Sequence, residues 1–122
     1  MVKYLVVILC IFSISCNKSN TANTICFKGK LALKGICMNY VIQIIEGDID
    51  KSLYENSWQN PNTGITYENV FGLASICTFP SNINEGEEFY FSIPKNPIAQ
   101  NCTKCEAFSP TPNKRISIEI CK

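Results

Sequence analysis

Hydrophobic and polar residues alternate along much of the chain after residue 25, which is the pattern of half-buried β-strands. The segments with the clearest alternation are 27–34, 36–45, 87–93 and 115–121. Residues 36–45 carry the longest apolar face, so we expect this strand to be the most buried. Within 87–93, the pattern predicts that Phe89 and Phe91 point inward and that Tyr90 and Ser92 point outward. Residues 65–79 predict one or two further short strands, broken at Gly72.

The segments between these strands read as turns and loops. Residues 47–62 are polar and irregular, residues 80–86 form a turn, and residues 94–113 are rich in proline. A short helical turn is expected near residues 99–107. Five or six strands therefore form one small all-β domain over residues 25–122. Because an antiparallel meander rarely leaves its edges open, we expect a closed or partly closed antiparallel barrel, OB-like, with a β-sandwich as the alternative.

The first fifteen residues have the layout of a secretory signal peptide. Lys3 supplies a positive charge, residues 4–12 form an apolar run, and Ser13 and Ser15 precede Cys16. Nine apolar residues span only about 14 Å as a helix, against a hydrocarbon core of about 30 Å. The sequence therefore predicts a signal peptide over residues 1–15 rather than a membrane-spanning helix.

The position of Cys16 directly after small residues is typical of a bacterial lipoprotein signal. In that class the cysteine carries the lipid, including palmitate, and becomes the first residue of the mature chain. Residues 16–24 would then be a lipidated tether, whose eight residues after Cys16 reach at most about 28 Å from the membrane. We expect a protein of the bacterial cell envelope, attached to the membrane through its lipid. The alternatives are an ordinary secreted protein and an uncleaved anchor.

The cysteine count agrees with a compartment outside the cytoplasm. The chain has eight cysteines, of which Cys10 leaves with the signal peptide. After lipidation of Cys16, the six that remain are Cys26, Cys37, Cys77, Cys102, Cys105 and Cys121. An even number in an oxidising compartment predicts three disulfides. Among fifteen pairings, we favour Cys102–Cys105, Cys37–Cys77 and Cys26–Cys121.

Residues Cys102 and Cys105 form a C-x-x-C motif, for which redox or metal chemistry must be weighed. A reactive pair needs a stabilised thiolate and a thioredoxin-like βαβ context, which the surrounding sequence lacks. A zinc site would need two further thiolates, which Cys37 and Cys77 could supply. We interpret the cysteines as structural and keep a thiol-disulfide or metal-handling protein as the alternative function.

Composition excludes several functions. The chain has no histidine, which removes catalytic triads built on histidine, and imidazole metal ligands. Without Lys3, basic and acidic residues balance, and no basic stripe stands out, so we expect no nucleic-acid partner. We expect no cofactor, no resident metal and no catalytic residue.

The aromatic residues Tyr54, Trp58 and Tyr67 lie in or beside the polar segment 47–62. Aromatic side chains on loops of a rigid scaffold are typical of binding sites. These three are therefore the candidate ligand contacts. Alternatively, Trp58 plugs one end of the barrel, because tryptophan is on average highly buried.

Several stretches together resemble a known group. They are residues 29–31 (GKL), 34–42 (KGICMNYVI) and 85–91 (EGEEFYF), followed by Cys102 and Cys105. Over residues 25–120 the chain is similar to small uncharacterised cysteine-rich lipoproteins of Bacteroidota. The resemblance implies location and fold and carries over no functional residue. We therefore expect a non-enzymatic binding or structural module that holds a protein or glycan partner.

Overall fold

The computed structural model describes residues 24–122. The predicted signal peptide, the lipidation site Cys16 and the tether up to residue 23 lie outside the described residues. None of the helices in the described part is long and apolar enough to cross a membrane.

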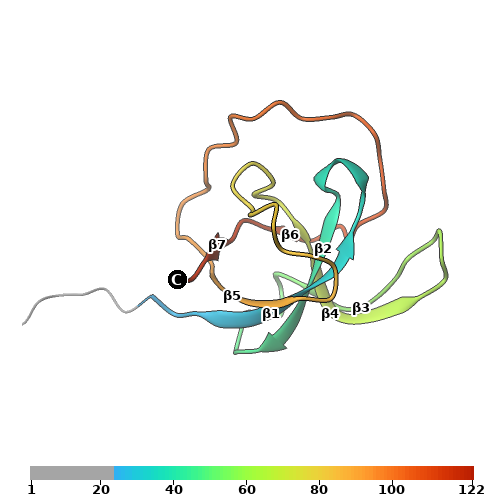
Figure 1. Cartoon of the computed structure of the whole chain (residues 1–122). Coiled ribbons are helices and arrows are strands. Elements are labelled where there is room, and N and C mark those ends of the chain that lie inside the picture. The colour runs from blue at the N-terminus through green and yellow to red at the C-terminus, as the bar shows by residue number, and fades with distance from the viewer. Residues whose placement is uncertain (1–23) are drawn as a thin grey trace, which may run out of the picture.

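The described chain is an all-β domain, as predicted (Figure 1). Its elements are β1 (Phe27–Lys34), the 3-10 turn η1 (Ile36–Met38), β2 (Tyr40–Glu46), β3 (Glu55–Gln59), β4 (Thr66–Leu73), β5 (Glu88–Ser92), β6 (Arg115–Ile116) and β7 (Glu119–Ile120). The strands form one sheet in the order β3-β4-β2-β1-β5-β7, and neighbours along this path are antiparallel.

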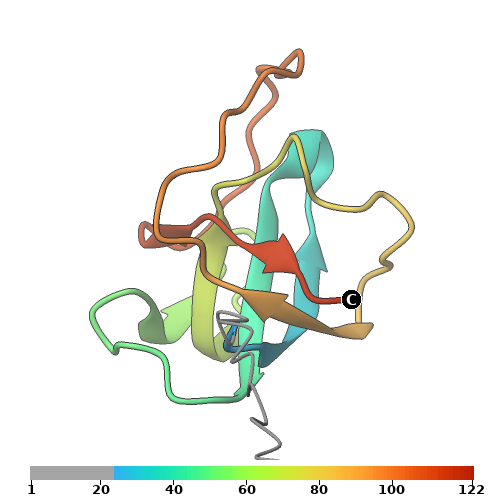
Figure 2. The ribbon, with the colours of Figure 1, turned by 90° about the vertical axis from the view of Figure 1, so that its left-hand side faces the viewer.

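The C-terminal segment turns this sheet into a partly closed barrel. Its strand β6 pairs with β4 in parallel, and its strand β7 pairs with β5. Each of these pairings involves two residue pairs, so the sheet bends round on itself without closing completely. Figure 2 shows this segment crossing in front of β4 and ending beside β5. The predicted partly closed barrel is confirmed, with the parallel β4–β6 contact as its one departure from antiparallel pairing.

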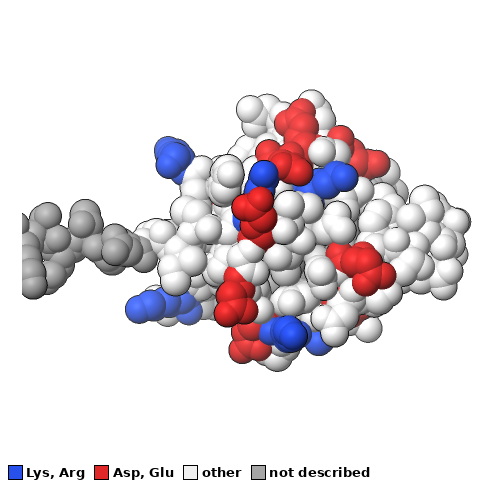
Figure 3. Space-filling model, turned by 90° about the horizontal axis from the view of Figure 1, so that it is seen from below, with Lys and Arg blue, Asp and Glu red and all other residues white. Residues whose placement is uncertain are grey.

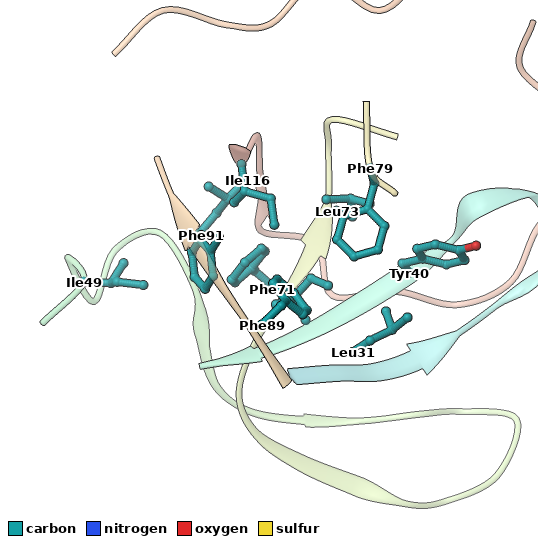
Figure 4. Packing of buried hydrophobic residues seen from close by; sticks show 11 residues of the cluster. Leu31, Tyr40, Ile49, Phe71, Leu73, Phe79, Phe89, Phe91 and Ile116 are labelled. Carbon is teal, nitrogen blue, oxygen red and sulfur yellow. The ribbon is translucent and has the colours of Figure 1, made fainter. Parts of the chain in front are cut away.

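The core lies inside the barrel and is rich in phenylalanine (Figure 4). The Phe71 and Phe91 rings meet edge to face with centroids 5.9 Å apart, and Phe89 lies 5.5 Å from Phe79. Leu31 and Ile42 complete this core from β1 and β2 and are fully buried. Because alternate residues of a strand face opposite sides of a sheet, the inward prediction for Phe89 and Phe91 is confirmed, and Tyr90 is exposed as predicted.

Three local predictions are wrong. Residues 36–38 form a 3-10 turn instead of extending the strand, because Cys37 adopts a left-handed backbone (φ 56°), and Ile36 is exposed. Ser92, predicted to face outward, is buried at the position where β5 pairs with β7. Residues 55–59, predicted as irregular chain, form strand β3.

Two further segments differ in detail. Strand β4 runs unbroken through Gly72, which pairs with Val41 on one side and with Arg115 on the other. A Cβ atom at Gly72 would lie only 3.2 Å from the Arg115 side chain and from a backbone carbonyl, which explains why glycine is found there. Residues 94–113 form a loop, as predicted, but the expected helical turn at 99–107 does not form.

All six predicted cysteines form disulfides, but two of the three predicted pairings are wrong. Cys26–Cys121 joins the start of β1 to the end of the chain, as predicted. The C-x-x-C cysteines do not pair with each other: Cys37 binds Cys105, and Cys77 binds Cys102. A Cys102–Cys105 bridge would only close a short loop, whereas the observed bridges fasten the long loop to the barrel at two points. In the chain-entropy model, a bridge that closes a longer loop stabilises the folded state more, because it restricts the unfolded chain more.

Candidate functional site

The β3–β4 hairpin extends beyond the barrel and forms the candidate site. Strand β4 pairs with β2 only through Val70–Gly72, whereas its first half, Thr66–Glu68, pairs only with β3. Figure 1 shows the hairpin projecting from the side opposite the first described residues. Within residues 24–122, β3 is the last strand of the sheet, so one of its edges has no neighbouring strand in this part of the chain.

The tip of the hairpin, residues 60–65, is built around Asn60. The buried Asn60 side chain accepts a hydrogen bond from the Asn62 N–H, 2.9 Å away, and the Asn60 N–H donates to the Ile65 carbonyl at 2.9 Å. The Asn60 carbonyl also accepts from the Gly64 N–H at 2.8 Å. Gly64 has φ 74°, a left-handed conformation that glycine adopts at low cost. These bonds give the tip a defined shape, so the hairpin can present its side chains in a fixed arrangement.

Trp58 and Tyr67 face each other across this hairpin. Their Cα atoms are register partners, and their ring centroids lie 5.9 Å apart with the ring planes tilted by 31°. Both side chains are half-buried, and neither belongs to the described hydrophobic core or to the side chains packed against it. The alternative that Trp58 plugs one end of the barrel is therefore wrong. The pair forms a separate aromatic surface outside the core.

The hairpin around this pair carries no charge. Between Glu55 and Glu68, the twelve residues 56–67 include no Asp, Glu, Lys or Arg, and most of the others are amide or hydroxyl side chains. In Figure 3 the end of the molecule formed by the hairpin is white, whereas charged side chains are spread over the rest of that face. Ile65 adds an aliphatic side chain that is 53% exposed. An uncharged aromatic surface can be covered by a ligand without the large cost of desolvating an ion.

Tyr54, the third predicted contact, belongs to a different environment. Its side chain packs against the hydrophobic core, and its carbonyl accepts a hydrogen bond from the Lys114 Nζ at 3.2 Å. The neighbouring Glu55 carboxylate accepts from the Asn113 N–H at 3.2 Å. These contacts fasten the base of the hairpin to the C-terminal segment. Tyr54 therefore supports the hairpin, and Trp58 and Tyr67 form its exposed aromatic pair.

A groove lies at the opposite end, beside the first described residues. This open groove of about 460 Å³ is lined by apolar side chains, among them Phe27, Ile49 and Leu53, together with Asp48 and Asp50. The Ser52 N–H and hydroxyl donate to the Asp50 carboxylate at 2.9 and 2.8 Å and lower the pKa of Asp50. The Asp50 carboxylate is therefore engaged in hydrogen bonds within a local turn. Among residues 24–122, no group of three or more acidic or cysteine side chains is placed to hold a metal ion.

The C-x-x-C motif is not assembled as a thiol pair in the structure. Cys105 is bonded to Cys37, and Cys102 is bonded to Cys77, whose sulfur also lies 3.3 Å from the Cys102 N–H. Both bridges lie on the long loop that runs over the top of the barrel in Figure 1. In this arrangement the motif fastens a loop, since each of its sulfurs is already bonded to a distant partner.

No family model, curated protein or solved structure matches the chain. The sequence predicts Trp58 and Tyr67 as ligand contacts but gives no sign of strand β3, which places Trp58 opposite Tyr67. The absence of charge over residues 56–67 was the signal in the sequence that sets the hairpin apart.

Proposed function

We propose that the protein is a non-enzymatic binding module, displayed on the bacterial cell envelope through a lipid on Cys16. The β3–β4 hairpin would be its contact surface. The observation that carries the binding role is the aromatic pair Trp58 and Tyr67, which lies on a projecting hairpin outside the core. Aromatic side chains are enriched at recognition surfaces, where they supply contact area at low entropic cost.

The N-terminal sequence supports anchoring. The apolar run of residues 4–12 is too short to span a membrane and is followed by small residues and Cys16, which is the layout of a lipoprotein signal. The remaining cysteines support an oxidising compartment, because all six within residues 24–122 are in disulfides.

The arrangement of the domain supports display. The described chain begins on one side of the barrel, and the hairpin projects from the opposite side (Figure 1). An anchor attached before residue 24 would therefore hold the hairpin on the side of the domain that faces away from the membrane. A tether of eight residues reaches at most about 28 Å, enough to lift the domain clear of the lipid headgroups.

Intact mass measurement of the native protein from a membrane fraction, before and after reduction with alkylation, tests this proposal. We expect the mass of residues 16–122 plus acyl lipid, with six cysteines alkylated only after reduction. The matched control is Cys16→Ser, which should leave the membrane fraction and keep its three disulfides. A wild-type mass without lipid would contradict anchoring. Free Cys102 and Cys105 before reduction would instead favour the thiol-disulfide or metal-handling alternative.

A further inference from the structure

We propose that the β3–β4 hairpin binds an uncharged polysaccharide chain, whose sugar rings stack on Trp58 and Tyr67. This inference names the ligand class of the proposed binding module and rests on that proposed function. It is carried by three properties of residues 56–67: the aromatic pair, the amide and hydroxyl side chains around it, and the absence of charge.

The aromatic pair offers a surface that suits sugar rings. A pyranose ring presents C–H groups on its faces and hydroxyl groups around its rim, so its face is apolar and its edge is polar. Trp58 and Tyr67 share one face of the hairpin because they are cross-strand partners, with centroids 5.9 Å apart. Aromatic faces carry partial negative charge and attract the weakly positive C–H groups of a ring lying on them.

The polar groups beside the aromatic pair suit hydroxyl groups. Asn56 lies two residues before Trp58 on β3 and therefore on the same face, and its side chain is exposed. Asn62 is exposed at the tip. A side-chain amide both donates and accepts hydrogen bonds, as a sugar hydroxyl does. The Gln59 amide, in contrast, already donates to the Gly64 carbonyl at 3.0 Å and holds the hairpin in shape.

Charge and size separate a neutral glycan from other polymers. No cation lies within residues 56–67 to attract nucleic acid or an acidic polysaccharide, and at the base Lys114 is accompanied by Glu55 and Glu68. A stable protein partner usually covers about 20–30 residues on each side. The projecting part of the hairpin offers only residues 56–67, and a narrow linear chain can be held by such a small surface. The geometry therefore points to a neutral glycan rather than to a protein.

The chain contains a single tryptophan, so Trp58 fluorescence reports directly on the site. The full-length protein is titrated with cello-, xylo-, laminari- and mannohexaose, and with hexagalacturonate as the charged comparator. We expect at least one neutral hexasaccharide to shift or quench the Trp58 emission in a saturable manner that does not depend on salt. Hexagalacturonate should bind at least about tenfold more weakly.

Substitutions place the effect on the hairpin. Tyr67→Ala should weaken binding of the active saccharide by about tenfold or more, which is the size of effect seen at binding hot spots. The matched control is Tyr90→Ala, which removes another exposed tyrosine from the outer face of β5. Tyr90→Ala should bind as the wild type does. Trp58→Ala is measured by calorimetry, because it lacks the fluorophore, and should also lose binding.

The outcomes distinguish a wrong ligand class from a wrong site. If no neutral hexasaccharide binds, or if hexagalacturonate binds best, the glycan proposal is overturned. Retention of Cys16→Ser and of Cys16→Ser/Trp58→Ala, neither of which can carry the lipid, on a cell-envelope fraction then tests the proposed function independently. If only the protein with Trp58→Ala loses retention, the hairpin is still the binding site, but its partner belongs to another class. If both proteins are retained equally, the hairpin is not the binding site. If sedimentation shows that the protein dimerises through the hairpin, the ligand is a second copy of the chain and not a glycan.

Discussion

The two halves of strand β4 have opposite environments. Val70, Phe71 and Leu73 in the second half are fully buried, and this half pairs with β2 and β6. The first half, Thr66–Glu68, pairs only with β3 and is exposed apart from the half-buried Tyr67. Continuous backbone pairing thus runs from a packed core into a projecting surface.

The residues in the barrel half of β4 stabilise the fold, whereas the residues in the hairpin half are not needed for the stability of the barrel. Folding buries the apolar side chains of the barrel away from water. This burial stabilises the fold, which explains why these residues are apolar. Trp58 and Tyr67 lie outside that core and still expose part of their rings. Substitutions in the two halves should therefore affect different properties, stability for the barrel and ligand binding for the hairpin.

The largest effect is expected for Phe91→Ala in the barrel. The Phe91 ring is fully buried and lies between 5.8 and 6.0 Å from the rings of Phe27, Phe71 and Phe89. Its removal leaves a cavity and should lower the free energy of unfolding by about 3–5 kcal/mol. Denaturant unfolding followed by circular dichroism measures this. A loss below about 1 kcal/mol would show that the aromatic core is not the stabilising region.

The next largest effect is expected for the bridge between the two ends of the domain. Replacing both Cys26 and Cys121 by serine should lower the free energy of unfolding by about 2–5 kcal/mol, because the bridge closes a loop with a sequence separation of 95. The matched control replaces Cys77 and Cys102, whose separation is 25. The chain-entropy relation predicts a loss about 1 kcal/mol smaller for this control. A larger loss in the control would contradict that relation and show that the long loop contributes through its packing.

A smaller effect is expected at the buried Ser75. Its hydroxyl donates to the Ile118 carbonyl at 3.0 Å and accepts from the Ile118 N–H at 2.9 Å, which fixes the C-terminal segment to the barrel. Ser75→Ala leaves both backbone groups without this partner and should cost about 1–3 kcal/mol. Thermal unfolding measures the loss. Ser57→Ala, on the exposed hairpin, serves as the control and should unfold like the wild type.

The smallest effect is expected at alkaline pH and concerns Tyr40. Burial raises the pKa of Tyr40 above its ordinary value of 10.0. The folded state therefore favours the neutral phenol, so its contribution to stability is complete below pH 10 and is lost as the pH rises through the raised pKa. Tyr40→Phe should show a shallower loss of stability above pH 10 than the wild type in pH-dependent denaturation. Identical slopes would contradict a buried phenol.

The sequence predicted those parts of the fold in which local pattern and burial agree. Alternation identified β1 and β5 because one face of each strand packs on the core. It missed β3, where the exposed segment around Trp58 shows no apolar alternation and the strand is defined by pairing with β4. The position of Trp58 opposite Tyr67 depends on that register, so it could not be predicted from either residue alone.

The disulfides show a similar division. The bridge Cys26–Cys121 was predicted as a tie between the first and last strands, and in the structure β1 and β7 lie on either side of β5. The other two bridges depend on the path of residues 94–113, which has no regular structure to predict it. Proximity in the sequence therefore suggested the pair Cys102 and Cys105, whereas the loop path carries each of them to a cysteine of the barrel.

The central claim is that the hairpin serves binding and the barrel serves stability. The most direct test compares the wild type with the double variant Trp58→Ala/Tyr67→Ala. Both proteins also carry Cys16→Ser, so that no lipid can hold them on the membrane. Retention on a cell-envelope fraction and the thermal unfolding midpoint are measured on the same preparation. The account predicts that retention is lost while the midpoint falls by only a few degrees, since loss of a cross-strand pair costs about 1 kcal/mol or less. Unchanged retention, or a collapse of the midpoint, would contradict it.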